Sequence, residues 1–91
     1  MIYKIEWKEH ALQNIEKLEG FIARRIFKKV EELSKNPFSR DIKRLKGSKD
    51  FRLRVGDYRV IFAIEVETII ILKVGHRKNI YDSFWIIRIS L

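Results

Sequence analysis

The 91-residue chain contains no cysteine, which excludes disulfide bonds and thiolate metal sites and is consistent with a reducing compartment. The first residues alternate polar and apolar, unlike a Sec-type signal peptide, and no apolar run approaches the ~20 residues that span a bilayer. Repeats, low-complexity tracts and linkers are also missing. We therefore expect a soluble, cytoplasmic protein without membrane attachment, folded as one domain over residues 1–91.

Positive charge is unevenly distributed along the chain, whose net charge is +8 with a pI of about 10.0. Residues 40–59 hold eight basic and three acidic side chains, and a second excess lies in residues 73–91. An apolar segment separates the two blocks. Such clustering indicates a polyanionic partner such as nucleic acid, and a merely solubilising surface is the alternative.

Hydrophobic periodicity predicts the first half of the fold. Residues 2–7 alternate as in an edge strand, and residues 8–18 have helical spacing. A second apolar stripe runs through residues 22–33 and ends before Pro37, because the residue preceding proline disfavours the helical region. We expect an antiparallel helical hairpin, followed by a basic loop over residues 38–50.

Three strand signals follow with short connections: Phe51–Val55, Tyr58–Val66 and Thr68–Val74, the last closed by Gly75. Short connections favour a three-stranded antiparallel meander. The order strand, two helices, three strands predicts an α+β fold with the helices on one face of the sheet. Residues 83–91 are apolar. The hydrophobic pattern does not show whether this tail is a further strand, packs on the sheet or is covered by a partner.

Alternation along these strands groups three arginines on the face away from the helices. Arg52 and Arg54 point opposite to Phe51, Leu53 and Val55, and a short turn brings Arg59 beside Arg54. Guanidinium groups so placed repel one another and match phosphate oxygens in geometry. The sequence thus indicates an anion site, and an ordinary solvated outer face is the alternative.

A second group follows the third strand: His76, Arg77 and Tyr81. Histidine titrates nearest to neutral pH, and tyrosine stacks on nucleic-acid bases. Each of these residues, taken alone, is more often an ordinary residue of the surface or of the sheet rim. Only their combination with the arginines indicates a catalytic site.

Three separated blocks resemble the RelE/ParE toxin superfamily, in particular RelE-type mRNA interferases of type II toxin–antitoxin pairs. They are Leu45–Gly47, Phe51–Phe62 and Val74–Tyr81, and with the helical hairpin they extend the resemblance over residues 1–82. The resemblance implies a fold like that of microbial ribonucleases. It also implies metal-independent, cofactor-free cleavage of mRNA in the ribosomal A site, by attack of a ribose 2′-OH on the adjacent phosphate.

The resemblance also implies roles for individual residues. Arg59 stabilises phosphate charge, Arg52 and Arg54 position it, Arg77 lies near the leaving oxygen, and Tyr81 stacks on or orients a base. RelE members commonly have lysine where this chain has Arg52 and Arg54, and arginine does not lose its proton. The general base therefore stays open between His76, a ribosomal group or water, and a mainly electrostatic mechanism. The expected RNA-binding residues are Lys43, Arg44, Lys46, Lys49 and Lys78.

The implied partners are the ribosome, mRNA and a RelB-like antitoxin, through which the complex would also contact operator DNA. We expect that antitoxin to be acidic and to bind with an amphipathic helix and an extended segment, with residues 83–91 as a candidate seat. Two other functions share the fold: a ParE-like toxin that binds DNA gyrase without cleaving RNA, and an inactive RNA- or DNA-binding module.

Overall fold

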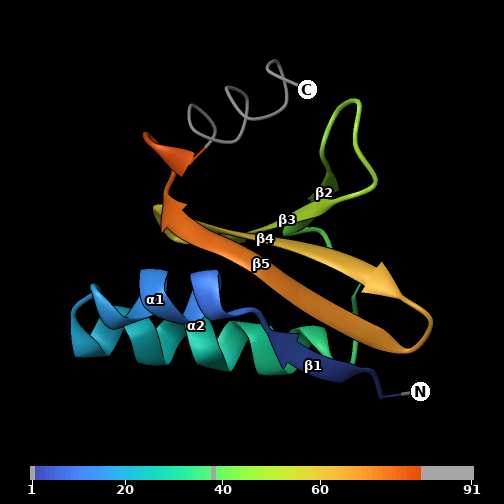
Figure 1. The fold of residues 1–91 in the computed structure, drawn as a ribbon, viewed down its shortest axis with the longest axis horizontal. Coiled ribbons are helices and arrows are strands. Elements are labelled where there is room, and N and C mark those ends of the chain that lie inside the picture. Colours follow the sequence, from blue (N-terminus) through green and yellow to red (C-terminus); the bar gives the residue numbers. More distant parts are fainter. Residues whose placement is uncertain (1, 38, 81–91) are drawn as a thin grey trace.

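The computed structural model describes residues 2–37 and 39–80, which form one five-stranded sheet with two helices against it (Figure 1). The strand order is β1-β5-β4-β3-β2. In chain order the elements are β1 (Lys4–Trp7), α1 (Glu9–Glu16), α2 (Gly20–Leu33), β2 (Ile42–Arg44), β3 (Phe51–Val55), β4 (Tyr58–Glu65) and β5 (Thr68–His76).

The sheet is antiparallel except at one edge. There β1 runs parallel to β5, with Lys4 opposite Thr68 and Trp7 opposite Ile71. The short strand β2 forms the other edge and pairs with β3. Helices α1 and α2 lie on the same side of the sheet (Figure 1). The expected α+β fold, with a helical hairpin and a meander of β3, β4 and β5, is confirmed.

The hydrophobic core lies between the helices and the sheet. The helices contribute Ala11, Ile15, Ile26, Val30 and Leu33, which recur at helical spacing and are buried. The sheet contributes alternate residues of its three long strands, led by Phe62, Ile69 and Ile71, each fully buried. Burial of a helical stripe against an alternating strand face explains why the two periodicities of the sequence meet in one core.

Two expectations about the elements were wrong. Residues 42–44 form β2 instead of part of a loop, because their backbone pairs with the edge of β3 although the segment is too short to show alternation. Gly75 does not close the last strand, since β5 continues through it to His76. A Cβ at Gly75 would lie 3.2 Å from the Ile80 Cδ1 atom, so glycine leaves room for the buried Ile80.

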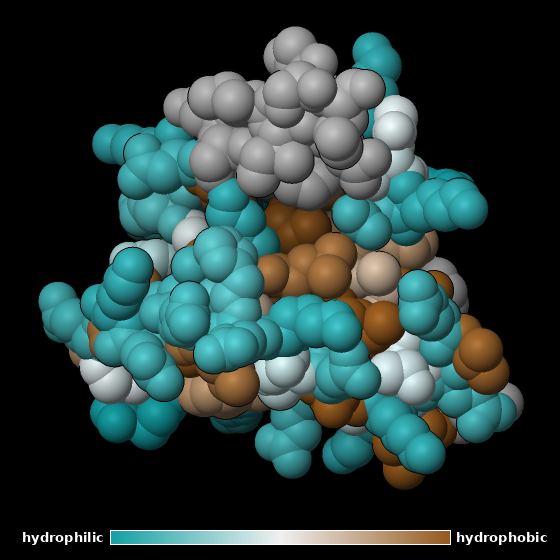
Figure 2. Space-filling model, viewed as in Figure 1, coloured by the Kyte–Doolittle hydropathy of each residue, from teal (hydrophilic) through white to brown (hydrophobic). Residues whose placement is uncertain are grey.

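Surface character follows the layers. Figure 2 shows hydrophilic residues over most of the visible surface, with apolar residues gathered near the middle of the sheet. Among the described residues, no helix has the length and apolar character needed to cross a membrane. The apolar tail predicted at residues 83–91 lies outside the described residues.

Candidate functional site

The sheet face opposite α1 and α2, which we call the open face, carries two cross-strand rows that are rich in basic side chains. Directly opposed residues share a face, so the register defines both rows. The first row runs Lys43, Arg52, Ile61, Lys73, and the second runs Arg54, Arg59, Gly75. The alternate positions of the same strands carry core residues that pack on the helices. Arg52, Arg54 and Arg59 therefore lie on one face, away from the helical layer.

Arg54 is held at the β2 side of this face by Asp41. Its Nη2 atom lies 3.0 Å from Asp41 Oδ1, and its backbone N–H donates to the Asp41 carbonyl at 2.9 Å. The second carboxylate oxygen accepts a hydrogen bond from Lys29 Nζ of α2 at 3.2 Å. The hydrogen bonds from Lys29 and then Arg54 lower the pKa of Asp41 below its ordinary value. Asp41 thus fixes Arg54 and ties it to the helical layer.

Two hydrogen bonds hold the Arg59 side chain over the β3–β4 turn. Its Nη1 atom donates to the carbonyl oxygens of Gly56 at 2.9 Å and of Tyr58 at 2.8 Å. Its Nε atom is buried and has no hydrogen-bond partner, the one such side-chain atom within the described ranges. A buried donor without an acceptor costs free energy. Hydrogen bonds from a charged guanidinium to an anion are stronger than those to neutral acceptors.

Arg77 reaches the same turn from the end of β5. Its backbone N–H donates to the Asp57 carbonyl at 2.8 Å, and its Nε atom lies 3.4 Å from Asp57 Oδ1. Gly56 has a φ of +59°, a left-handed backbone conformation that residues with a Cβ atom disfavour. Glycine at this position therefore allows the turn. The turn therefore brings Arg59 and Arg77 to one end of the sheet, although 17 positions separate them in the sequence.

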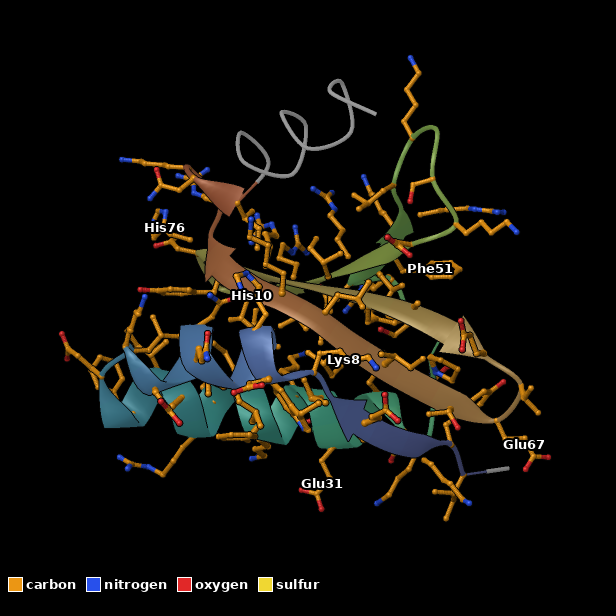
Figure 3. The ribbon with its side chains drawn as sticks, viewed as in Figure 1. Lys8, His10, Glu31, Phe51, Glu67 and His76 are labelled. Carbon is orange, nitrogen blue, oxygen red and sulfur yellow. The ribbon has the colours of Figure 1, made fainter. Side chains whose placement is uncertain are left out.

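His76 does not join the arginines. It is the last residue of β5 (labelled in Figure 3) and lies directly opposite Tyr58, which packs against the core on the helical side. The two rings meet edge to face at 5.3 Å. The His76 Nδ1 atom accepts the Lys78 N–H at 3.1 Å. Strand alternation thus directs His76 away from the open face, contrary to its candidacy as the base. Tyr81 lies outside the described residues.

The expected RNA-binding residues do not all lie on the open face. Lys43 stands beside Arg52 on the open face, whereas Arg44 alternates to the other side and donates from Nε to the Ser48 carbonyl at 3.3 Å. Lys46 and Lys49 are exposed in the β2–β3 loop. Lys78 is exposed in the turn after β5. Only Lys43 shares the open face with the arginines by register.

One basic residue of this face escaped the sequence analysis. Lys73 is half-buried on β5, opposite Ile61 and in the same row as Arg52. Burial lowers the pKa of its ammonium group. Alternation alone does not assign it, because the β4–β5 pairing shifts register between Ile61 and Phe62. Within the described part of the chain, no three His, Cys, Asp or Glu side chains are placed to share a metal ion.

The helical hairpin, the mostly antiparallel sheet and the basic open face together define a small toxin-like domain of the RelE type. A family model described as the ParE toxin of the type II toxin–antitoxin system parDE matches residues 5–81. Toxin RelE3 of Methanocaldococcus jannaschii is 36% identical over 86 residues, a match that covers 89% of this chain and 98% of the relative. The chain belongs to the RelE/ParE toxin superfamily.

Solved structures agree with this assignment. A crystal structure of the RelB–RelE antitoxin–toxin complex from Methanococcus jannaschii contains a chain with 32% identity and a TM-score of 0.71, covering 87% of this chain and 98% of that one. The toxin–antitoxin complex RelBE2 from Mycobacterium tuberculosis contains one with 28% identity and a TM-score of 0.75, covering 85% and 100%. The protein is a RelE-like toxin of a toxin–antitoxin system.

Proposed function

We propose that this toxin is an endoribonuclease that cleaves mRNA in the ribosomal A site without a metal ion. The single observation that carries the proposal is the state of Arg59. Its guanidinium is fixed by two carbonyl oxygens, and its buried Nε lacks an acceptor. A fixed donor needs no reorganisation when charge develops on a phosphate, which is how preorganised sites lower a reaction barrier.

The neighbouring side chains supply the other electrostatic functions. Arg52 and Arg54 position the phosphodiester from β3, and Arg77, held to the same turn as Arg59, stabilises the leaving 5′-oxygen. Tyr81 stacks on or orients a base. Lys43, Lys46, Lys49 and Lys78 attract the RNA backbone, with Arg44 at the edge of this surface.

A RelB-like antitoxin is the proposed partner that neutralises the toxin in the cytoplasm. Support comes from the structural relatives, which are complexes of a RelE-type toxin with its antitoxin. The net charge of +8 favours an acidic antitoxin by electrostatic complementarity. Operator DNA is a proposed partner of the complex through the antitoxin.

The test is in vitro translation with mapping of mRNA 5′ ends. We expect ribosome-dependent cuts in phase with codons, and Arg59→Ala should lower the cleavage rate by about 10²–10³-fold, as for loss of one preorganised donor. Arg24→Ala, on the exposed side of α2, is the matched control and should cleave normally. Intact mRNA with the wild-type toxin, or undiminished cleavage by Arg59→Ala, would contradict the proposal.

A second function is favoured by the match to the parDE toxin model. A ParE-like toxin would inhibit DNA gyrase and leave mRNA intact, so a supercoiling assay on the same preparation separates the two functions. An inactive nucleic-acid-binding module would bind RNA but show neither activity.

A further inference from the structure

The β3–β4 turn, which holds Arg59 and Arg77, also contacts the helical layer through Arg25 of α2. A Cβ atom built on Gly56 would lie 3.1 Å from the Arg25 Nη1 atom and 3.3 Å from both Cζ and Nη2. Three such similar distances place this point over the flat face of the guanidinium. Glycine at position 56 therefore leaves the space in which Arg25 packs on the turn.

Arg25 carries its charge without a carboxylate partner. Its side chain is exposed. Within residues 2–37 and 39–80, the ion pairs engage Glu6, Asp41 and Asp57, and none of them includes Arg25. The N–H groups of a guanidinium lie in its plane, so packing of the flat face on Gly56 leaves them able to donate to an anion. Phosphate oxygens match this geometry.

Arg25 and Arg59 contact the same residue of the turn. Arg59 Nη1 donates to the Gly56 carbonyl at 2.9 Å from the open face, whereas Arg25 reaches Gly56 from the helical layer. Because both groups contact Gly56, backbone dimensions limit the separation of their Nη1 atoms to roughly 10 Å or less. A single RNA strand can therefore pass around this end of the sheet from Arg59 to Arg25.

An apolar recess of about 190 Å³ lies beside Arg25. Phe21 and Arg25 line it from α2, and Val55, Asp57 and Tyr58 line it from the β3–β4 hairpin. Phe21 and Arg25 are four residues apart on α2, so they are neighbours on one helix face. Phe21 is 61% exposed, which leaves its ring accessible to a stacking partner. An accessible aromatic ring beside a guanidinium suits a nucleotide, whose base stacks while its phosphate binds the cation.

We propose that Phe21, Arg25 and the recess bind a nucleotide of the RNA next to the phosphate held by Arg59. The inference rests on the proposed function and adds a second nucleotide-binding site to it. Asp57, the one carboxylate in the described lining, is paired with Arg77 Nε at 3.4 Å. Three guanidinium groups thus meet one carboxylate at the turn, and the remaining positive charge favours a phosphate.

The phosphate contact is tested by the salt dependence of RNA binding, measured by fluorescence anisotropy with a labelled oligouridylate. Arg25→Ala should reduce the slope of log affinity against log salt by about 0.7, the value for one phosphate that is no longer neutralised on a single strand. Arg24→Ala is the matched control. Arg24 is also exposed on α2 but lies over Gly20, with Nη1 3.2 Å from a Cβ built there, so its loss should leave the slope unchanged.

The base contact is tested with oligonucleotides that carry the fluorescent base 2-aminopurine at successive positions, because stacking quenches its emission. Wild-type protein should quench one position strongly. Phe21→Ala should relieve this quenching and weaken binding by about fivefold or more, with an unchanged salt slope, and Phe21→Tyr should retain both. Phe27→Ala is the control and should behave as wild type, since Phe27 is 42% exposed on α2 but packs on Trp7 at 4.9 Å.

The outcomes separate this inference from the nuclease proposal. Wild-type affinity, slope and quenching in both Arg25→Ala and Phe21→Ala would leave the recess to a protein partner and overturn the inference, while ribosome-dependent cleavage by the wild-type toxin would still support the nuclease. RNA binding that changes as expected in these variants, together with intact mRNA, would support the nucleotide site and overturn the nuclease proposal. Equal urea midpoints for the variants and wild type check that the fold is kept.

Discussion

Asp41 is the residue that connects the open face to the helical layer. Its two carboxylate oxygens are engaged by Arg54 of β3 and Lys29 of α2. The side chain is about one quarter exposed, so solvent partly screens both contacts. Its main effect is on orientation, because it holds the Arg54 guanidinium at one end of the second basic row.

The lowered pKa of Asp41 makes a prediction about acid stability. The folded pKa is below the ordinary value of 3.8, so the contribution of Asp41 to stability is present above pH 3.8 and is lost as the pH falls through the folded pKa. Asp41→Asn should be less stable than wild type at pH 7, and the two should converge at lower pH. Urea unfolding at both pH values measures this, and a constant difference would contradict it.

At the scale of elements, the two turns of the meander differ in what they contribute. The β3–β4 turn uses Gly56 at positive φ and collects Arg59 and Arg77. The β4–β5 turn places Val66 at a φ of 55°, a conformation that is unfavourable for a β-branched side chain. Val66 is 94% exposed, so its side chain contributes almost no packing in return. The first turn therefore serves the site, and the second carries backbone strain.

This strain predicts a stabilising substitution. Val66→Asn should raise the free energy of unfolding by about 1 kcal/mol, because asparagine tolerates the left-handed region at lower cost. Val66→Thr is the control, since threonine is also β-branched and should leave stability unchanged. Urea denaturation measures both, and an unchanged midpoint for Val66→Asn would show that the turn is not strained.

For the whole molecule, the distribution of positive charge bears on the proposed binding of RNA. The helical layer covers one face of the sheet, and the basic rows with the loop residues Lys46 and Lys49 lie elsewhere. For the proposed RNA partner, a net charge of +8 on a molecule of this size predicts that several phosphates bind together.

Salt dependence tests this distribution. Binding of single-stranded RNA should weaken linearly in a plot of log affinity against log salt, and Lys46→Ala with Lys49→Ala should reduce the slope by about 0.7 for each phosphate that the variant no longer neutralises. Lys28→Ala, exposed on α2, should leave the slope unchanged. Fluorescence anisotropy at several salt concentrations gives the slopes, and a flat wild-type response would indicate a protein target instead.

Local patterns in the sequence determined much of this protein. Helical spacing predicted both helices, and alternation predicted β3, β4 and the shared face of Arg52, Arg54 and Arg59. These features depend on residues near one another in the chain, where backbone geometry dictates which side chains share a face.

Tertiary structure alone decided the rest. β2 forms because its backbone pairs with the edge of β3, and β5 continues through Gly75 to His76 because both residues pair with β4. The register shift at Ile61 and the opposite orientations of His76 and Lys73 follow from pairing between β4 and β5. Pairing partners and register are set by contacts between strands, and a one-residue shift moves a side chain to the other face, so periodicity within a strand does not determine them.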